Sequence, residues 1–275
     1  MNQQPQGYPS LTKSYKGIYP FKIGTTSFIY PDHYIPNVKM LGPYLDEIEL
    51  LVFESQGANA VCSRKVTAEL CRLAADVDLS YNIHLPTDVS ISDPNPVWQN
   101  NAVDTLIRVI ELAQPLDPSA LILHVPYSEK SFDNGVVRTW QNRVYQNLKE
   151  IVAAVENKNI IAIENLDYPL EMLEDIIVDL GLSICLDLGH LMVYGYDVLE
   201  IFSKYAAKTS VLHLHGVENG RDHITLERLS DKLFERVLRV LYKFSGVVSL
   251  EVFSFENLDS SLKYLESRWH ISEDR

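Results

Sequence analysis

"SICLDLGHLMVYGYDVLEIFSKYAAKTSVLHLHGV", residues 183–217, contains the unit that repeats through the whole chain. It begins with a short apolar run at 183–191, continues through a helix-like stretch at 197–207, and ends with a second apolar run at 210–217. Short runs of nearly continuous apolar residues are typical of strands that are buried on both faces. The stretch therefore predicts a strand, a helix and a second strand, as in parallel sheets.

The same unit recurs on both sides of this stretch. Further apolar runs predict strands at 21–29, 47–53, 80–86, 120–126, 160–166 and 246–253. Stretches with helical periodicity lie between or after them, at 35–46, 66–78, 97–114, 136–157, 170–181, 229–245 and 258–269. Eight strands that alternate with eight helices in 275 residues predict a single (β/α)8 TIM barrel of the α/β class.

The competing architecture is a doubly wound open sheet. Such a sheet usually carries a glycine-rich phosphate loop, G-x-G-x-x-G, after its first strand. The sequence at 23–28 is IGTTSF, which does not match that loop. We therefore assign residues 21–275 to one barrel and the polar, turn-rich residues 1–20 to an N-terminal extension.

Composition restricts the partners. The chain has 24 basic and 37 acidic side chains, for a net charge of −13, which predicts a small-molecule substrate and no nucleic-acid partner because an acidic surface repels phosphate backbones. The three cysteines, Cys62, Cys71 and Cys185, are odd in number and widely spaced, as expected of free thiols. Without a signal peptide or membrane span, we expect a cytoplasmic chain with no membrane partner. Nothing indicates the oligomeric state.

Ionisable side chains gather where the predicted strands end, which is the functional edge of such a barrel. Nine of them follow predicted strands three to eight: His84, His124, Glu164, Asp187, His190, His213, His215, His223 and Glu251. One such histidine alone would be an ordinary core or capping residue. Together they predict a metal centre, because neighbouring carboxylates repel one another without a cation, and these strand ends carry no Lys or Arg.

The ligand types also indicate which metals suit this centre. Imidazole and carboxylate together bind Zn²⁺, Mn²⁺, Fe²⁺ and Co²⁺. The sequence contains neither the G-x-S-x-G of a nucleophilic serine nor a phosphate-binding P-loop. Metal-assisted chemistry is therefore the favoured class.

With these residues the chain resembles the xylose isomerase-like TIM barrel superfamily, and within it the endonuclease IV branch. The resemblance rests on D-x-x-H at 187–190, H-L-H at 213–215, D-H at 222–223 and L-E at 250–251. It implies two or three divalent ions, most often zinc, that hydrolyse a phosphodiester. It assigns the first ion to His84, His124 and Glu164, the second to Glu164, Asp187, His213 and Glu251, and the third to His190 and His223.

The chain departs from that branch at the third ion. The branch has a carboxylate two residues before the loop histidine, where this chain has Arg221, with Asp222 beside it. We expect Arg221 to face a substrate phosphate, and we predict Asp222 and His33 as further substrate contacts. The candidate catalytic residues are Glu164, Glu251 and His215.

Two longer stretches narrow the resemblance further. "IGTTSFIYPDHYIPN" at 23–37 and "HLHGVENGRDH" at 213–223 resemble the cobamide-remodelling phosphodiesterases (CbiR), which cleave a cobamide into cobinamide phosphate and an α-riboside. Three alternatives remain open. The first is a sugar isomerase or epimerase of the same superfamily, which would use one metal. The second is an endonuclease IV-like AP endonuclease, and the third is a metal-binding barrel without catalysis.

Overall fold

Eight parallel strands close into a barrel in the computed structural model, which describes residues 7–52 and 63–273, with the backbone alone for 270–273. Around the barrel the order is β1-β10-β7-β6-β5-β4-β3-β2, and β1 pairs with β2 to close it. The strands are β1 (Lys22–Thr26), β2 (Glu47–Leu51), β3 (Ser80–His84), β4 (Leu121–Leu123), β5 (Ile161–Glu164), β6 (Ser183–Asp187), β7 (Thr209–Leu214) and β10 (Val247–Leu250). The predicted TIM barrel is confirmed.

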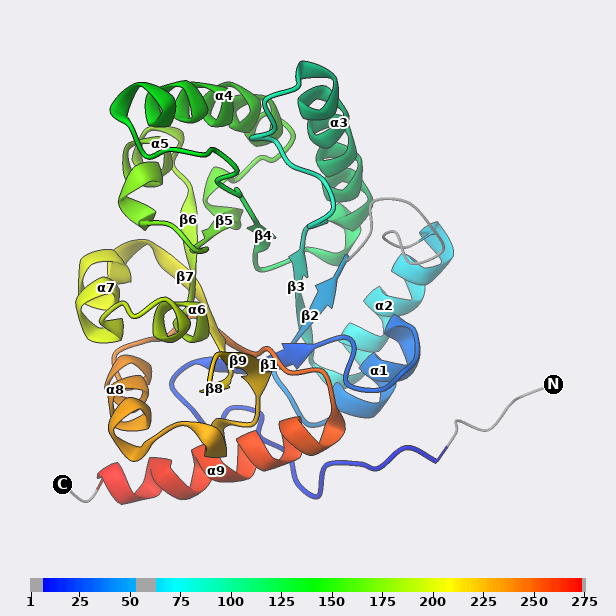
Figure 1. Ribbon diagram of the computed structural model, residues 1–275. Helices are drawn as coiled ribbons and strands as arrows, with labels where there is room; N and C mark the ends of the chain where they lie inside the picture. The colour runs from blue at the N-terminus through cyan, green and yellow to red at the C-terminus, as the bar shows by residue number, and fades with distance from the viewer. Residues whose placement is uncertain (1–6, 53–62, 274–275) are drawn as a thin grey trace.

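Helices surround the strands on the outside of the barrel (Figure 1). They are α1 (Tyr34–Leu41), α2 (Arg64–Val77), α3 (Pro96–Ala113), α4 (Asn134–Val152), α5 (Glu174–Leu180), α6 (Leu188–Val193), α7 (Val198–Tyr205), α8 (Asp231–Leu241) and α9 (Phe255–Glu273). Polar residues begin several of them. Ser63, Asn95 and Ser230 each accept a hydrogen bond from a backbone N–H of the first turn of α2, α3 and α8.

Two local predictions were wrong. The strand predicted at 183–191 ends at Asp187, whose side chain accepts the backbone N–H of His190 (2.8 Å) and so caps the additional short helix α6. The loop predicted after β7 contains a two-stranded antiparallel hairpin, β8 (Gly216–Glu218) and β9 (Arg221–Ile224).

Phe53 of the predicted second strand and the predicted free thiol of Cys62 lie outside the described residues, whereas Cys71 and Cys185 are free thiols.

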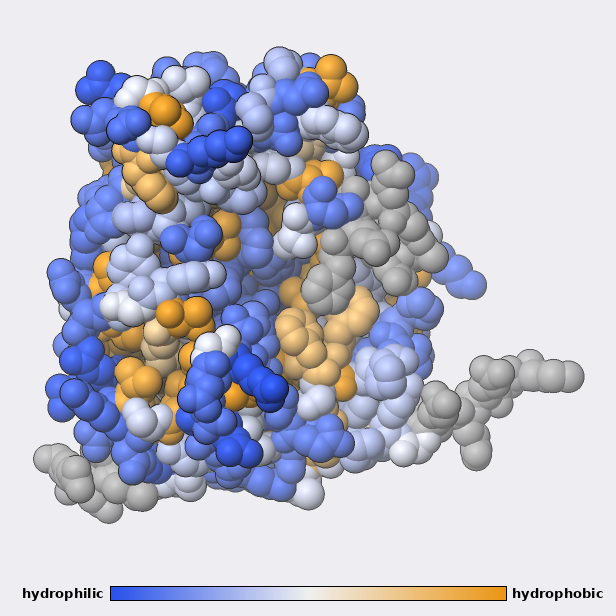
Figure 2. Space-filling view, in the orientation of Figure 1, coloured by the Kyte–Doolittle hydropathy of each residue, from blue (hydrophilic) through white to orange (hydrophobic). Residues whose placement is uncertain are grey.

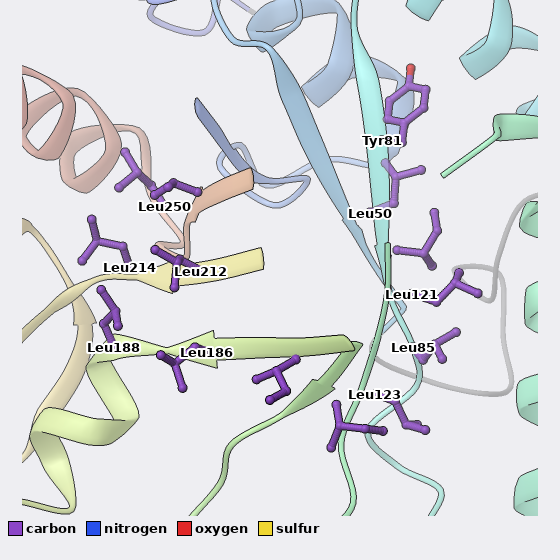
Figure 3. Close-up of a cluster of buried hydrophobic side chains, with 14 of the residues drawn as sticks. Leu50, Tyr81, Leu85, Leu121, Leu123, Leu186, Leu188, Leu212, Leu214 and Leu250 are labelled. Atoms are coloured by element: carbon purple, nitrogen blue, oxygen red, sulfur yellow. The ribbon is translucent and has the colours of Figure 1, made fainter. Parts of the chain in front are cut away.

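Side chains of the barrel strands alternate between the interior and the surrounding helices. The interior holds a small separate cluster of apolar side chains: Ala120, Ile122, Ala162, Cys185, Val211 and Val247. The outward-facing positions carry larger residues, such as the leucines of β6, β7 and β10 that Figure 3 labels, and these join the main core with the helices. The two layers explain why each strand reads as a continuous apolar run.

The N-terminal extension packs against the barrel. Leu11 and Tyr15 are buried, and the Tyr15 backbone N–H donates to the Tyr44 carbonyl (2.8 Å). In Figure 1 this segment runs beside α9, where Tyr19 meets Trp269 edge to face at 5.1 Å. Aromatic burial thus holds the arm in place.

Hydrophilic residues cover most of the face shown in Figure 2 and separate smaller hydrophobic areas. Among the described residues, no helix is both long enough and apolar enough to cross a membrane.

A cluster of aromatic residues supports the backbone that follows β4. The buried Trp140 donates its Nε1–H to the Pro126 carbonyl (3.2 Å), and the Tyr168 hydroxyl donates to the Val125 carbonyl (2.5 Å). The two rings meet edge to face at 5.4 Å. These contacts hold the chain directly after His124.

We predict that Trp140→Ala lowers the free energy of unfolding by about 3–5 kcal/mol, because it opens a cavity in the core and removes a hydrogen bond to the Pro126 carbonyl. Urea unfolding followed by circular dichroism measures the loss. Trp98→Ala is the control: this side chain is 62% exposed, so its removal should change the free energy by no more than about 0.5 kcal/mol. Equal losses for the two variants would contradict the assignment of Trp140 to the core.

Candidate metal centre

A layer of ionisable side chains lies directly above the apolar interior of the barrel. Because strand side chains alternate, the interior positions two residues beyond Ile122, Ala162, Cys185 and Val211 also point inward. These positions hold His124, Glu164, Asp187 and His213. The alternation thus brings imidazoles and carboxylates from different strands to one level of the barrel, and the structure groups them into the three sets described next.

The first ligand group consists of His84, His124 and Glu164, whose potential ligand atoms lie within 4.8 Å of one another. The Nε2 atoms of His84 and His124 lie 3.2 Å and 2.9 Å from the same oxygen, Glu164 Oε2. On the other side of its ring, His84 Nδ1 lies 3.0 Å from the Leu85 carbonyl, to which it donates. That hydrogen bond leaves the Nε2 lone pair of His84 directed into the group, as in a metal-binding histidine.

The second ligand group consists of Glu164, Asp187, His213 and Glu251, again within 4.8 Å. His213 Nδ1 lies between three carboxylates, 3.1 Å from Glu251 Oε2, 3.6 Å from Glu164 Oε1 and 4.0 Å from Asp187 Oδ2. Glu164 therefore presents Oε2 to the first group and Oε1 to the second. The residues that the resemblance assigned to two ions do come together in the fold.

The third ligand group consists of His190, His215 and His223, and its potential ligand atoms also lie within 4.8 Å. His190 comes from α6, His215 follows β7, and His223 belongs to β9. The sequence predicted His190 and His223 as ligands and His215 as a catalytic residue, whereas the structure places all three rings together.

Glu49 belongs to the site, although the sequence analysis missed it. His213 Nε2 donates to Glu49 Oε2 (3.1 Å), on the side of the ring opposite the second group. Glu49 is completely buried and lies in the middle of β2, whereas the sequence-based prediction rested on residues at the ends of strands. The signal was the sequence EIELL at 47–51, where two glutamates two residues apart interrupt an apolar strand on one side.

Two unpaired buried atoms indicate that the second group fits a metal ion. His213 Nδ1 and Glu251 Oε2 are 3.1 Å apart, yet neither atom has a hydrogen-bond partner among the described residues. Buried polar atoms are nearly always paired, and a cation between these donors would satisfy both. Cys185 Sγ also lies near Glu164 and His213, but burial raises the pKa of this thiol and makes it the weakest donor.

The carboxylates and imidazoles perturb one another strongly. Burial opposes the charged form of His84, but its hydrogen bond to Glu164 and the surrounding carboxylates outweigh burial and raise the pKa of His84 to about 9. Burial likewise opposes ionisation of Glu164, yet the neighbouring His124 and His213 hold the pKa of this carboxyl well below its usual range. The pKa of His223 rises to about 9 against burial, because Glu251 and Asp222 favour its charged form.

Of the three predicted substrate contacts, Asp222 touches a histidine of this centre. Asp222 Oδ1 is 3.0 Å from His223 Nδ1, so Asp222 orients that ring. Arg221 is exposed in β9, and His33 is exposed directly before α1. Within the described residues no hydrogen bond or ion pair joins the His33 ring or the Arg221 guanidinium to the ligand groups. Their roles as substrate contacts, and that of Asp222, stay predictions.

We predict that the thermal stability of chelator-treated protein falls as the pH rises from 6.5 to 9. The pKa values of His84 and His223 are raised to about 9 by folding, so their stabilising contribution is complete below the ordinary value of 6.5 and is lost as the pH passes 9. Melting curves at constant ionic strength measure the effect. Zinc-loaded protein should not lose stability in this window, because cations replace the protons; a rising Tm without metal would contradict the assignment.

We also predict that Glu49→Gln weakens metal binding about 10- to 100-fold, because the amide cannot hold His213 Nε2–H as a carboxylate does. Competition with a chromophoric chelator measures the affinity. Glu47→Gln is the matched control on the same strand: Glu47 accepts from Ser80, Asn82 and Ser119 and contacts no histidine of the centre. An equal change in affinity for both variants would mean that Glu49 has only a structural role.

Comparisons with known proteins agree with this architecture. The chain matches the family described as "Xylose isomerase-like TIM barrel" over residues 38–268. A D-tagatose 3-epimerase-like protein of known structure shares 23% identity, with a TM-score of 0.78 and coverage of 92% of this chain and 99% of that chain. The search of proteins with curated descriptions returned no match.

Two further solved structures are similar. Endonuclease IV from Thermus thermophilus has 19% identity and a TM-score of 0.68, with coverage of 90% of this chain and 99% of that chain. The IOLI protein, whose structure was solved with a bound zinc atom, has 14% identity and a TM-score of 0.71, with coverage of 90% of this chain and 99% of that chain. At these identities the structures show a shared fold alone. Because the family match spans most of its 275 residues, the chain belongs to the xylose isomerase-like TIM barrel family.

Proposed function

We propose that the chain is a metal-dependent phosphodiesterase that acts on a small molecule, and that this substrate is a cobamide. The observation that carries the proposal is the position of Glu164. One of its oxygens faces His84 and His124, and the other faces His213. A carboxylate shared between two ligand groups suits two adjacent cations, and paired cations are typical of phosphoester hydrolysis.

The buried and the exposed residues of the centre would have different roles. The first two ligand groups would hold the cations, and bound divalent ions supply electrophilic stabilisation of the charge that develops on a phosphoester. Glu164, Asp187 and His213 are buried and fix the base of the site, whereas the side chains of His124 and His223 are 26% and 24% exposed and lie toward solvent. A substrate would therefore approach from the side of His124 and His223.

Hydrolysis forms a P–O bond to the oxygen of water and breaks the P–O bond to the leaving nucleoside. The water proton must be removed, and the leaving oxygen must gain a proton. We assign the first task to the Glu251 oxygen other than Oε2, because His213 keeps this buried carboxyl ionised by holding its pKa well below the usual range, and only an ionised carboxylate can accept a proton. In this position Glu251 accepts the proton, and the solvent protonates the leaving oxygen.

Charge and surface chemistry support a cobamide over DNA. The net charge of −13 disfavours a polyanionic partner. Two large aromatic side chains flank the third ligand group: the Tyr194 ring lies 6.2 Å from His190, and the Phe253 ring lies 5.4 Å from His223. Both are more than 40% exposed, so they offer contact area to a bulky substrate body.

The test is incubation of metal-loaded protein with cobalamin and pseudocobalamin, with products identified by mass spectrometry. We expect cobinamide phosphate and the corresponding α-riboside in equal amounts. Glu164→Gln should reduce the rate at least about 100-fold, because both ligand groups lose a shared carboxylate. Glu150→Gln, on the exposed surface of α4, should leave the rate unchanged.

Absence of product with Zn²⁺, Mn²⁺, Fe²⁺ and Co²⁺ would refute the cobamide as substrate. Hydrolysis of a chromogenic phosphodiester under the same conditions would still support a phosphodiesterase that acts on another substrate. Absence of both reactions would refute the whole proposal. Cleavage of DNA with an abasic site would favour the endonuclease alternative.

A sugar epimerase is the second candidate, favoured by the similarity to the D-tagatose 3-epimerase-like protein. In that reaction Glu164 and Glu251 would act as the acid–base pair beside a single cation in the second ligand group. His84→Ala and His124→Ala separate the two candidates. A phosphodiesterase loses its activity in both variants, whereas an epimerase acting on D-tagatose retains turnover in both.

A further inference from the structure

We propose that His190, His215 and His223 form a three-imidazole binding site for a divalent cation such as Zn²⁺, in which His215 takes the place of a carboxylate ligand. The rings come from three separate elements, and their potential ligand atoms lie within 4.8 Å of one another. The site stands on its own geometry and does not depend on which reaction the chain catalyses. Its distinguishing features are the space made for His215, the strained backbone of His223 and the hydrogen bonds on the outer ring nitrogens.

Gly189 makes the space that His215 occupies. A Cβ atom at position 189 would lie 2.0 Å from His215 Cε1 and 2.2 Å from Nε2, so no other residue fits without displacing the ring. Gly189 lies inside the D-x-x-H motif, directly before His190. The helix that carries His190 therefore also provides the surface on which His215 rests, and this fixes the two rings relative to each other.

The hairpin holds His223 in a strained conformation. His223 has φ +53°, in the left-handed region that non-glycine residues rarely adopt, and the β8–β9 pairing shifts register between Gly216 and Glu218. With this backbone the His223 ring stacks on His215, with centroids 4.2 Å apart and planes 15° apart. Backbone strain of this kind costs about 1–3 kcal/mol and is retained where it positions a functional group.

The outer nitrogens of two rings are already tied to oxygen atoms. His190 Nδ1 donates to the Asn165 carbonyl (3.1 Å), and His223 Nδ1 lies 3.0 Å from Asp222 Oδ1. In metal-binding histidines the second ring nitrogen has just such a partner, which directs the other nitrogen to the ion. Asp222 therefore orients His223 from outside the group and is not the third ligand.

His215 can present its own Nε2 after a change of tautomer. Its Nδ1 accepts the backbone N–H of His223 (3.0 Å), which places the ring proton on Nε2, beside Asp187 Oδ1 (3.3 Å). The Gly216 carbonyl lies 3.3 Å from the same Nδ1. With the proton on Nδ1 this carbonyl becomes the acceptor, and the Nε2 lone pair is free for the cation.

The ligand chemistry determines what else this site binds. Three neutral imidazoles leave the charge of a divalent cation uncompensated within the group, and a zinc ion with three protein ligands keeps a fourth position open. The side chains of His190 and His223 are 16% and 24% exposed, whereas that of His215 is buried. A cation held there would be reachable from the side of His190 and His223, and it would suit an anionic oxygen, such as that of a phosphoester or a carboxylate.

Metal content tests the proposal without any substrate. Protein is saturated with Zn²⁺ and desalted, and its zinc content is measured by inductively coupled plasma mass spectrometry. The natural sequence should hold three ions per chain, and His215→Ala and Gly189→Ala should each hold two. Gly135→Ala is the control and should hold three, since a Cβ at position 135 meets no atom within 4 Å. Asp222→Asn should still bind the third ion, but more weakly, since Asp222 orients His223 from outside the group. Thermal melts verify that each variant is folded.

Cobalt substitution gives a second readout that does not depend on the count. Replacing Zn²⁺ by Co²⁺ gives visible absorption bands, and the bands of the third ion should disappear in His215→Ala while the others remain. Three ions retained in folded His215→Ala, or only two in the saturated natural sequence, would overturn the site. Loss of the ion in Asp222→Asn with retention in His215→Ala would assign the third ligand to Asp222. These counts are independent of the cobamide assay, so the two proposals fail separately.

Discussion

The buried charge of Glu164 is the constraint on which the rest of the site depends. Its carboxylate is 1% exposed, and the rings of four histidines approach its two oxygens within 3.6 Å: His84, His124, His190 and His213. A buried carboxylate is stable only if its charge is compensated. The interior of this barrel is therefore organised to place positive charge, from protons or from cations, around one residue of β5.

A second layer of contacts keeps these rings in place. The Nδ1 atoms of His84 and His190 are tied to backbone carbonyls, and Nε2 of His213 is tied to Glu49. Because a carbonyl or carboxylate accepts a proton on one nitrogen, the other nitrogen presents a lone pair. The centre is thus preorganised by the barrel backbone as much as by the ligands, which explains how eight strands of ordinary apolar sequence support polar chemistry.

The family membership leaves the reaction open, and the details of the centre narrow it. Epimerase-like and endonuclease structures share this fold with the chain at 23% and 19% identity. Within the fold, the shared carboxylate of Glu164 favours more than one cation, whereas the second ligand group alone would serve a single one. At the third group, the sequence has Arg221 where the resemblance to endonuclease IV implies a carboxylate, and the structure brings His215 to His190 and His223.

The barrel and most members of the ligand groups were predictable from the sequence, because the alternation of strand side chains is local and places His84, Glu164 and Asp187 where strands end. The role of Glu49 was not, because its contact with His213 joins residues 164 positions apart across the barrel. The third group also needed the fold. His215 joins it through the space at Gly189 and the left-handed backbone of the hairpin, and neither close packing nor strain is visible in a pattern of residue types.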